Sequence, residues 1–213
     1  MNLTKEKEAT GETTSVIVLS PSPEGNLKTR AIRLFGSLTE DKAEEIVQSL
    51  FDFEKLGIEA AQEESTNSKN TSEIIHKPID FYISTWGGCA YSMFALYDVV
   101  RSIREHCDIQ TWGLGKVMSA GVLLLAAGTK GKRKIGKHCR IMIHSAAGDQ
   151  WGPLHSLENE MNEIRWIQEQ HITALIKETN LTKRQLKKML DRRVNVYLNA
   201  KEAVEYGIAD IIV

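Results

Sequence analysis

The apolar residues of this 213-residue chain follow two alternating patterns, and each pattern predicts one kind of element. Short apolar runs ended by glycine, proline or polar residues predict strands at 16–19, 31–35, 79–85, 109–114, 140–143 and 208–213, with a further strand at Ile135. Apolar residues that recur every three or four positions predict helices at 40–53, 91–105, 119–127, 155–178, 183–191 and 200–206. Strands that alternate with helices favour an α/β fold with right-handed crossovers.

The first predicted helix carries the signals of a helix start. Thr39 suits the N-cap position, and the two acidic residues after it, Glu40 and Asp41, place negative charge where the helix dipole favours it. The polar stretch 58–76 has no apolar face and predicts a surface loop or, alternatively, a continuation of this helix. Residues 1–15 are polar and lack periodicity, so we expect a disordered segment there and a single domain at 16–213.

The longest helical pattern, at 155–178, has apolar surface on more than one side. Its main stripe consists of residues at roughly helical spacing, namely Leu157, Met161, Ile164, Ile167, Ile172 and Leu175. Trp166 falls outside that stripe. The pattern predicts either a wide core-facing surface or a helix shared with a neighbouring subunit.

Charge and composition exclude some partners. The chain has 27 Lys and Arg against 28 Asp and Glu, which gives no electrostatic reason for binding nucleic acid or an anionic membrane. The longest apolar run, 120–128, is shorter than a membrane span, and the N-terminus lacks the apolar core of a secretory signal. Three cysteines without CxxC spacing indicate reduced thiols. We therefore expect a cytoplasmic protein.

Three predicted strand ends carry residues of the kinds found in catalytic or binding sites. Gly87 and Gly88 can turn backbone N–H groups toward a ligand, although most such pairs are simple turns. Ser119 opens an apolar helix, as a nucleophile or as an ordinary N-cap. His144 closes an apolar strand, as a general base or as a structural histidine. The five other histidines (His76, His106, His138, His155, His171) have no such setting and no metal-ligand spacing, so we expect no metal site.

Four segments in order resemble the proteolytic subunit of the Clp protease. They read TWGGCAYSMFALYDVV, GKVMSAGVLLLAAGTKGKR, RIMIHSA and YLNAKEAVEYGIAD, and the resemblance spans residues 30–210. It implies a serine endopeptidase with Ser119 as nucleophile and His144 as base. The oxyanion donors it implies are the backbone N–H groups of Gly88 and Ala120.

The chain departs from the family pattern at the third catalytic position. The family has Asp three residues before the leucine of its (F/Y)LSA-type segment, whereas this chain has Asn195 three residues before Leu198. An amide oxygen can orient a histidine but cannot stabilise the imidazolium with a full charge. Asp191 is the alternative acid. Smaller departures are Trp86 before the paired glycines, Ser and Ala after His144, and an apparent insertion near 65–70.

The resemblance also implies an architecture and partners. The fold would be a crotonase-like spiral of βαβ units, with the helix at 155–178 as a protruding handle that interlocks two stacked heptameric rings. The segment 148–152 would pair with extended substrate by strand addition. Unfolded proteins would be cleaved inside the ring chamber after delivery by a hexameric AAA+ unfoldase. The ATP would be used by that partner, so no cofactor is expected in this chain.

Two other functions remain open from the sequence. A crotonase-fold acyl-CoA enzyme would use the Gly88 and Ala120 region to hold an enolate, but such enzymes need no serine nucleophile. A degenerate, weakly active or inactive subunit of a mixed ring would explain Asn195, although the retained Ser119 and His144 count against it.

Overall fold

The computed structural model describes residues 30–67, 77–148, 151–190 and 194–213. The strand expected at 16–19 and the disordered segment expected at 1–15 lie outside these ranges. None of the helices that are described is long and apolar enough to cross a membrane.

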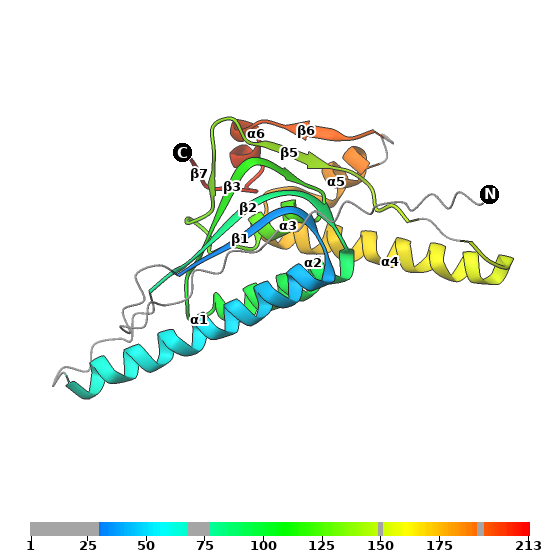
Figure 1. The fold of residues 1–213 in the computed structure, drawn as a ribbon. Helices are drawn as coiled ribbons and strands as arrows, with labels where there is room; N and C mark the ends of the chain where they lie inside the picture. The colour runs from blue at the N-terminus through cyan, green and yellow to red at the C-terminus, as the bar shows by residue number, and fades with distance from the viewer. Residues whose placement is uncertain (1–29, 68–76, 149–150, 191–193) are drawn as a thin grey trace, which may run out of the picture.

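The described residues form a seven-stranded mixed sheet, which confirms the predicted α/β class (Figure 1). Its main path runs in the order β1 (Ala31–Leu38), β2 (Ile79–Gly88), β3 (Ile109–Met118), β4 (Lys134–Ile135) and β7 (Ile211–Ile212), with every neighbouring pair parallel. A branch adds β5 (Arg140–Ile143) parallel to the end of β3 and β6 (Val196–Leu198) antiparallel to β5. The carboxyl ends of β2, β3 and β5 therefore meet at one edge, where parallel sheets commonly hold their binding sites.

Helices cover the sheet and connect its strands. They are α1 (Glu40–Asn67), α2 (Ala90–Ile103), α3 (Ala120–Ala126), α4 (Leu154–Glu178), α5 (Lys183–Leu190) and α6 (Ala200–Glu205). Helices α1 and α2 pack against each other beneath the sheet, and α3 is wholly buried between β2, β3 and α4. The fully buried side chains of the core come from β1, β2 and β3 and from α1, α2 and α3. Burial alternates along β2, whereas every residue of α3 is buried, which explains the continuous apolar run of that helix.

The structure corrects the expected loop at 58–76. Helix α1 continues through Asn67, so the loop prediction is wrong for residues 58–67 and the alternative, a continued helix, holds there. Residues 68–76 lie outside the described ranges. Figure 1 shows this end of α1 projecting beyond the sheet, which fits a stretch whose sequence has no apolar face.

Only the C-terminal end of α4 belongs to the core. Its buried residues are Ile172, Ala174, Leu175 and Glu178, whereas Leu154, Met161 and Trp166 are exposed. Figure 1 shows α4 extending well beyond the rest of the domain, as a handle would. The prediction of a wide core-facing surface is therefore wrong, because the sheet and α3 reach only the last turns of the helix.

A buried carboxylate fixes the C-terminal end of α4 to α2. Glu178 is 1% exposed, and its Oε1 accepts hydrogen bonds from Tyr97 (2.9 Å), Arg101 (2.6 Å) and Arg104 (3.1 Å). Because a buried charge is tolerated only when it is paired and hydrogen-bonded, this cluster determines where α4 leaves the core.

A second buried ion pair explains the two most specific segments of the family resemblance. Arg133, from the GTKGKR segment, donates from Nε to Asp210 at 2.8 Å, and Asp210 ends the EAVEYGIAD segment. The same guanidinium donates to the carbonyl of Ala126 in α3 (3.2 Å) and to that of Glu178 in α4 (2.8 Å). One side chain thus joins α3, α4 and the C-terminal strand.

Candidate active site

Ser119 stands on a sharp turn between β3 and α3. It has φ 53° and ψ −121°, and it is the only non-glycine residue with positive φ among the described residues. Ser119 occupies the N-cap position of α3, as one of the two sequence interpretations expected, but its side chain makes no capping hydrogen bond, so capping does not explain the choice of serine. Backbone strain of this kind costs about 1–3 kcal/mol and is typical of functional sites, including the nucleophile elbow of serine hydrolases.

Glycine in β2 makes room for this turn. Gly87 has φ +92°, and a Cβ added to it would lie 2.6 Å from the Cβ of Ser119. Gly121 is equally confined, since its Cβ would lie 2.3 Å from a side-chain carbon of Thr85. The glycines at the end of β2 and the start of α3 therefore let two backbones approach more closely than other residues would allow.

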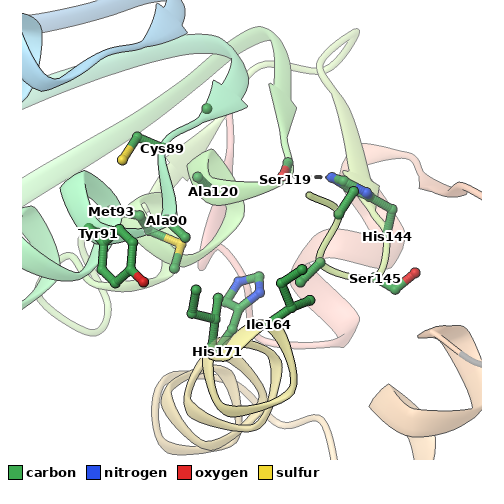
Figure 2. A pocket seen from close by; sticks show the side chains of 14 residues that line it. Cys89, Ala90, Tyr91, Met93, Ser119, Ala120, His144, Ser145, Ile164 and His171 are labelled. Carbon is green, nitrogen blue, oxygen red and sulfur yellow. Dashed lines mark hydrogen bonds between the residues drawn. The ribbon is translucent and has the colours of Figure 1, made fainter. Parts of the chain in front are cut away.

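His144 contacts the serine directly. It follows the last residue of β5, and its Nε2 lies 2.7 Å from the Oγ of Ser119 (Figure 2). The backbone N–H of Ser119 also donates to the carbonyl of Met142 in β5 at 2.8 Å, which fixes the two strand ends together. With its proton on Nδ1, His144 accepts a hydrogen bond from the serine hydroxyl, which is the arrangement that general-base activation requires.

The segment after His144 is held against α4. The N–H of Ala146 donates to the Oε1 of Gln168 at 3.1 Å. A Cβ on Gly148 would lie 2.9 Å from the side chain of Ile164, so this backbone runs close along the helix. Of the segment expected to bind substrate, residues 149–150 lie outside the described ranges, and its pairing with substrate stays a prediction.

Asn195 lies next to His144 along the sheet but does not bond to it. The antiparallel ladder between β5 and β6 ends with Ile143 opposite Val196. His144, which follows Ile143, and Asn195, which precedes Val196, are therefore neighbours. Asn195 is exposed, and among the described residues no hydrogen bond joins its side chain to His144. Asp191 lies outside the described residues. The role of Asn195 as orienter therefore stays a prediction.

The two expected oxyanion donors lie beside the serine. Gly88 ends β2 and Ala120 begins α3, and both line the same cavity as Ser119. A Cβ on Gly87 would be 3.1 Å from the backbone nitrogen of Ala120, which shows how closely the two strand ends approach. The first N–H groups of a helix have no partner within the helix, so that of Ala120 is available to a ligand. Their role as oxyanion donors stays a prediction.

A cavity of about 330 Å³ opens in front of Ser119 and His144. Residues from α2, α3, the segment after β5 and α4 line it, among them Cys89, Met93, Ile164, Ile167 and His171 (Figure 2). The described residues contain no group of three His, Cys, Asp or Glu positioned to bind a metal.

His171 is the cavity residue that the sequence did not single out. Its sequence context predicts no functional setting, yet it belongs to the cavity wall. Burial lowers the pKa of His171 to about 4, and the nearby His144 acts in the same direction. A signal did exist, because Ile164, Ile167 and His171 follow the spacing of one helix face.

A serine hydroxyl on a strained strand-to-helix turn, in contact with a histidine, is an arrangement typical of serine hydrolases. The model of one family, Clp protease, matches residues 68–213. The chain belongs to the Clp protease family, which confirms the resemblance of its sequence motifs. Its α/β sheet and handle helix agree with the crotonase-like fold of that family.

Similar proteins carry the same family name. The ATP-dependent Clp protease proteolytic subunit 1 of Prochlorococcus marinus subsp. pastoris is 34% identical over 186 residues, which cover 87% of this chain and 84% of that protein. Subunit 1 of P. marinus strain MIT 9312 is 36% identical over 136 residues, or 64% of this chain and 68% of that protein. Subunit 4 of Rhodococcus jostii is 36% identical over 135 residues, or 63% and 68%.

Proposed function

We propose that this chain is a serine endopeptidase subunit that cleaves unfolded proteins. The observation that carries the proposal is the 2.7 Å contact between Ser119 Oγ and His144 Nε2, made on a strained turn that faces a cavity. A structural serine needs neither the strain nor the histidine. Membership in a family of peptidases supports the same conclusion.

The proposed reaction follows from these positions. Ser119 Oγ attacks the peptide carbonyl while its proton passes to His144 Nε2, and the carbonyl oxygen gains the negative charge. The N–H groups of Gly88 and Ala120 hold that oxyanion, each contributing about 3 kcal/mol of transition-state stabilisation. The C–N bond then breaks as His144 returns the proton to the leaving amine, and water releases the acyl group by the same route.

Asn195 is the proposed orienter of His144. The pairing of β5 with β6 supports this, because it makes the two residues neighbours at the end of the ladder. Its carbonyl oxygen would accept the Nδ1–H of His144 once the exposed side chain turns toward the ring. The lack of that bond among the described residues favours the second candidate, a weakly active or inactive subunit of a mixed ring.

We further propose that the subunits assemble into two stacked heptameric rings and receive substrates from an AAA+ unfoldase. The exposed apolar residues on the protruding part of α4, such as Leu154 and Met161, support assembly through the handle. The curated relatives are described as ATP-dependent. In this proposal ATP is consumed by the unfoldase, and this chain needs no cofactor of its own.

Labelling with a fluorophosphonate separates these functions. The wild-type protein should form a covalent adduct at Ser119 and hydrolyse small fluorogenic peptides, and Ser119→Ala should do neither while keeping its assembly. Adduct without turnover would identify a weakly active or inactive subunit. No adduct would contradict the nucleophile assignment. If the chain were an acyl-CoA enzyme, its Ser119→Ala variant would turn over thioesters as fast as the wild type. The observed contact of serine and histidine counts against this function.

A further inference from the structure

The floor of the cavity carries a polar group among apolar walls. His171 comes from the same face of α4 as Ile164 and Ile167, and its ring points from the helix into the cavity below Ala120 (Figure 2). Met93 closes the cavity on the α2 side. On the side of the cavity away from Ser119 and His144, the imidazole is thus a polar group among the apolar side chains of Met93, Ile164 and Ile167.

This imidazole has no hydrogen-bond partner among the residues that the structure describes. Its Nε2 is buried and unpaired, and no described residue bonds to the other ring nitrogen either. Buried polar atoms in folded proteins nearly always have a partner, so an unpaired one requires an explanation. Since burial lowers the pKa of His171 to about 4, the ring is neutral at neutral pH and offers one donor and one acceptor.

The position of the ring relative to the nucleophile identifies its occupant. In the proposed reaction the leaving amine faces His144, which protonates it. The residue whose carbonyl is attacked at Ser119 therefore extends the other way, into the part of the cavity bounded by Met93, Ile164 and His171. A side chain that fills this space meets apolar walls along its stem and the imidazole at its end.

We propose that His171 makes this cavity a subsite for a neutral amide side chain, glutamine above all, at the residue on the acyl side of the cleaved bond. The proposal rests on the proposed peptidase function and specifies its substrate. The glutamine stem contacts Met93 and Ile164, while its amide offers both a donor and an acceptor to the neutral ring. Leucine would leave the ring nitrogens unpaired, and a carboxylate would bury a charge without a cation to pair with.

The first test is a panel of fluorogenic peptides that differ only in this residue: Gln, Leu, Glu and Lys. The wild type should cleave the Gln peptide with a kcat/KM at least about tenfold above that of the Leu peptide. His171→Leu should reverse this order, and His171→Gln, which keeps a neutral donor and acceptor, should retain it. His155→Leu, which changes an exposed histidine of the same helix, is the matched control and should keep the wild-type order.

The second test needs no turnover, so it separates the inference from the peptidase function. Fluorescently labelled peptides ending in Gln, Leu or Glu are titrated into Ser119→Ala and into Ser119→Ala/His171→Leu, with binding followed by anisotropy. Tighter binding of the Gln peptide to the first protein and of the Leu peptide to the second supports the subsite, whether or not the wild type turns over. The same order of affinities in both proteins overturns it, even if the wild type is an active peptidase.

Discussion

The Cβ position of Gly87 lies 2.6 Å from the Cβ of Ser119, closer than two such carbons can approach. The end of β2 is therefore packed against the turn that carries the serine, and neither backbone can move without the other. The strain at Ser119 persists because the surrounding strands hold the turn in place.

Gly87→Ala should inactivate the protein without unfolding it. The added methyl group displaces the Ser119 turn, and a shift of about 1 Å at a reacting group costs roughly 100-fold in rate. The measurement is the rate of fluorophosphonate labelling together with native mass. Gly136→Ala is the matched control, since its Cβ would make an ordinary contact of 3.6 Å. Undiminished labelling of Gly87→Ala would show that the close approach does not position the serine.

Asn195→Asp should raise kcat for small peptides by about tenfold or more, equivalent to about 1.4 kcal/mol in the barrier. A carboxylate stabilises the imidazolium that forms when His144 takes the serine proton, whereas an amide only orients the ring. Steady-state kinetics of the wild type, Asn195→Asp and Asn195→Ala decide the matter. Asn162→Asp, which adds the same charge on exposed α4, should change nothing. Equal rates for all variants would mean that another group orients His144.

Glu178→Gln should lower the free energy of unfolding by about 3 kcal/mol, because Arg101 and Arg104 would lose their buried counter-charge. Urea unfolding at fixed subunit concentration measures the loss. Glu169→Gln is the control, since its carboxylate pairs with Lys183 and Lys187 in solvent and should matter little. If Glu178→Gln lost as little free energy of unfolding as the control, the buried cluster would not stabilise the C-terminal end of α4.

The same cluster predicts a pH dependence of stability. Burial acts to raise the pKa of Glu178, but hydrogen bonds from Arg104, Tyr97 and Arg101 outweigh it and hold the pKa below its usual value of 4.5. The carboxylate therefore stabilises the folded state fully above about pH 4.5, and this contribution is lost as the pH falls through the depressed pKa. The difference in stability between wild type and Glu178→Gln should shrink as the solution is acidified, and a constant difference would contradict the assignment.

Met161→Asp should weaken ring stacking. Met161 is 52% exposed on the protruding part of α4, and an aspartate there would bury a charge if this face meets another subunit. Native mass measurement should shift from a fourteen-subunit assembly toward single heptameric rings. Asn162→Asp introduces the same charge at the adjacent position and should leave the assembly intact. An unchanged mass for Met161→Asp would show that the handle interface lies elsewhere.

The sequence predicted the strand–helix alternation and the serine–histidine pair because these depend on local pattern and family motifs. It ended β3 at Gly115, whereas the strand continues through Met118. Gly115 has φ +63°, and the pairing of β2 with β3 shifts register between Ile83 and Thr85. This glycine therefore marks an irregularity inside a strand and not the end of it.

Other features could not be derived from local pattern. Polar residues 58–67 continue α1 because nothing ends the helix, and periodicity detects only buried faces. The setting of His171 depends on how α4 crosses the carboxyl edge of the sheet, which no single segment encodes. Whether Asn195 reaches His144 depends on one exposed side chain, which the pattern of strands does not fix.

The pairing of Arg133 with Asp210 has a consequence for the order in which the protein folds. The two residues are 77 positions apart, and the guanidinium that joins α3 to α4 lacks this counter-charge until folding brings Asp210 to it. Before then the cation must either stay in water or be buried alone, and both options prevent the helix that follows Ser119 from settling against the sheet. We therefore expect the serine to acquire its geometry late in folding, after segments distant in the sequence have come together around it.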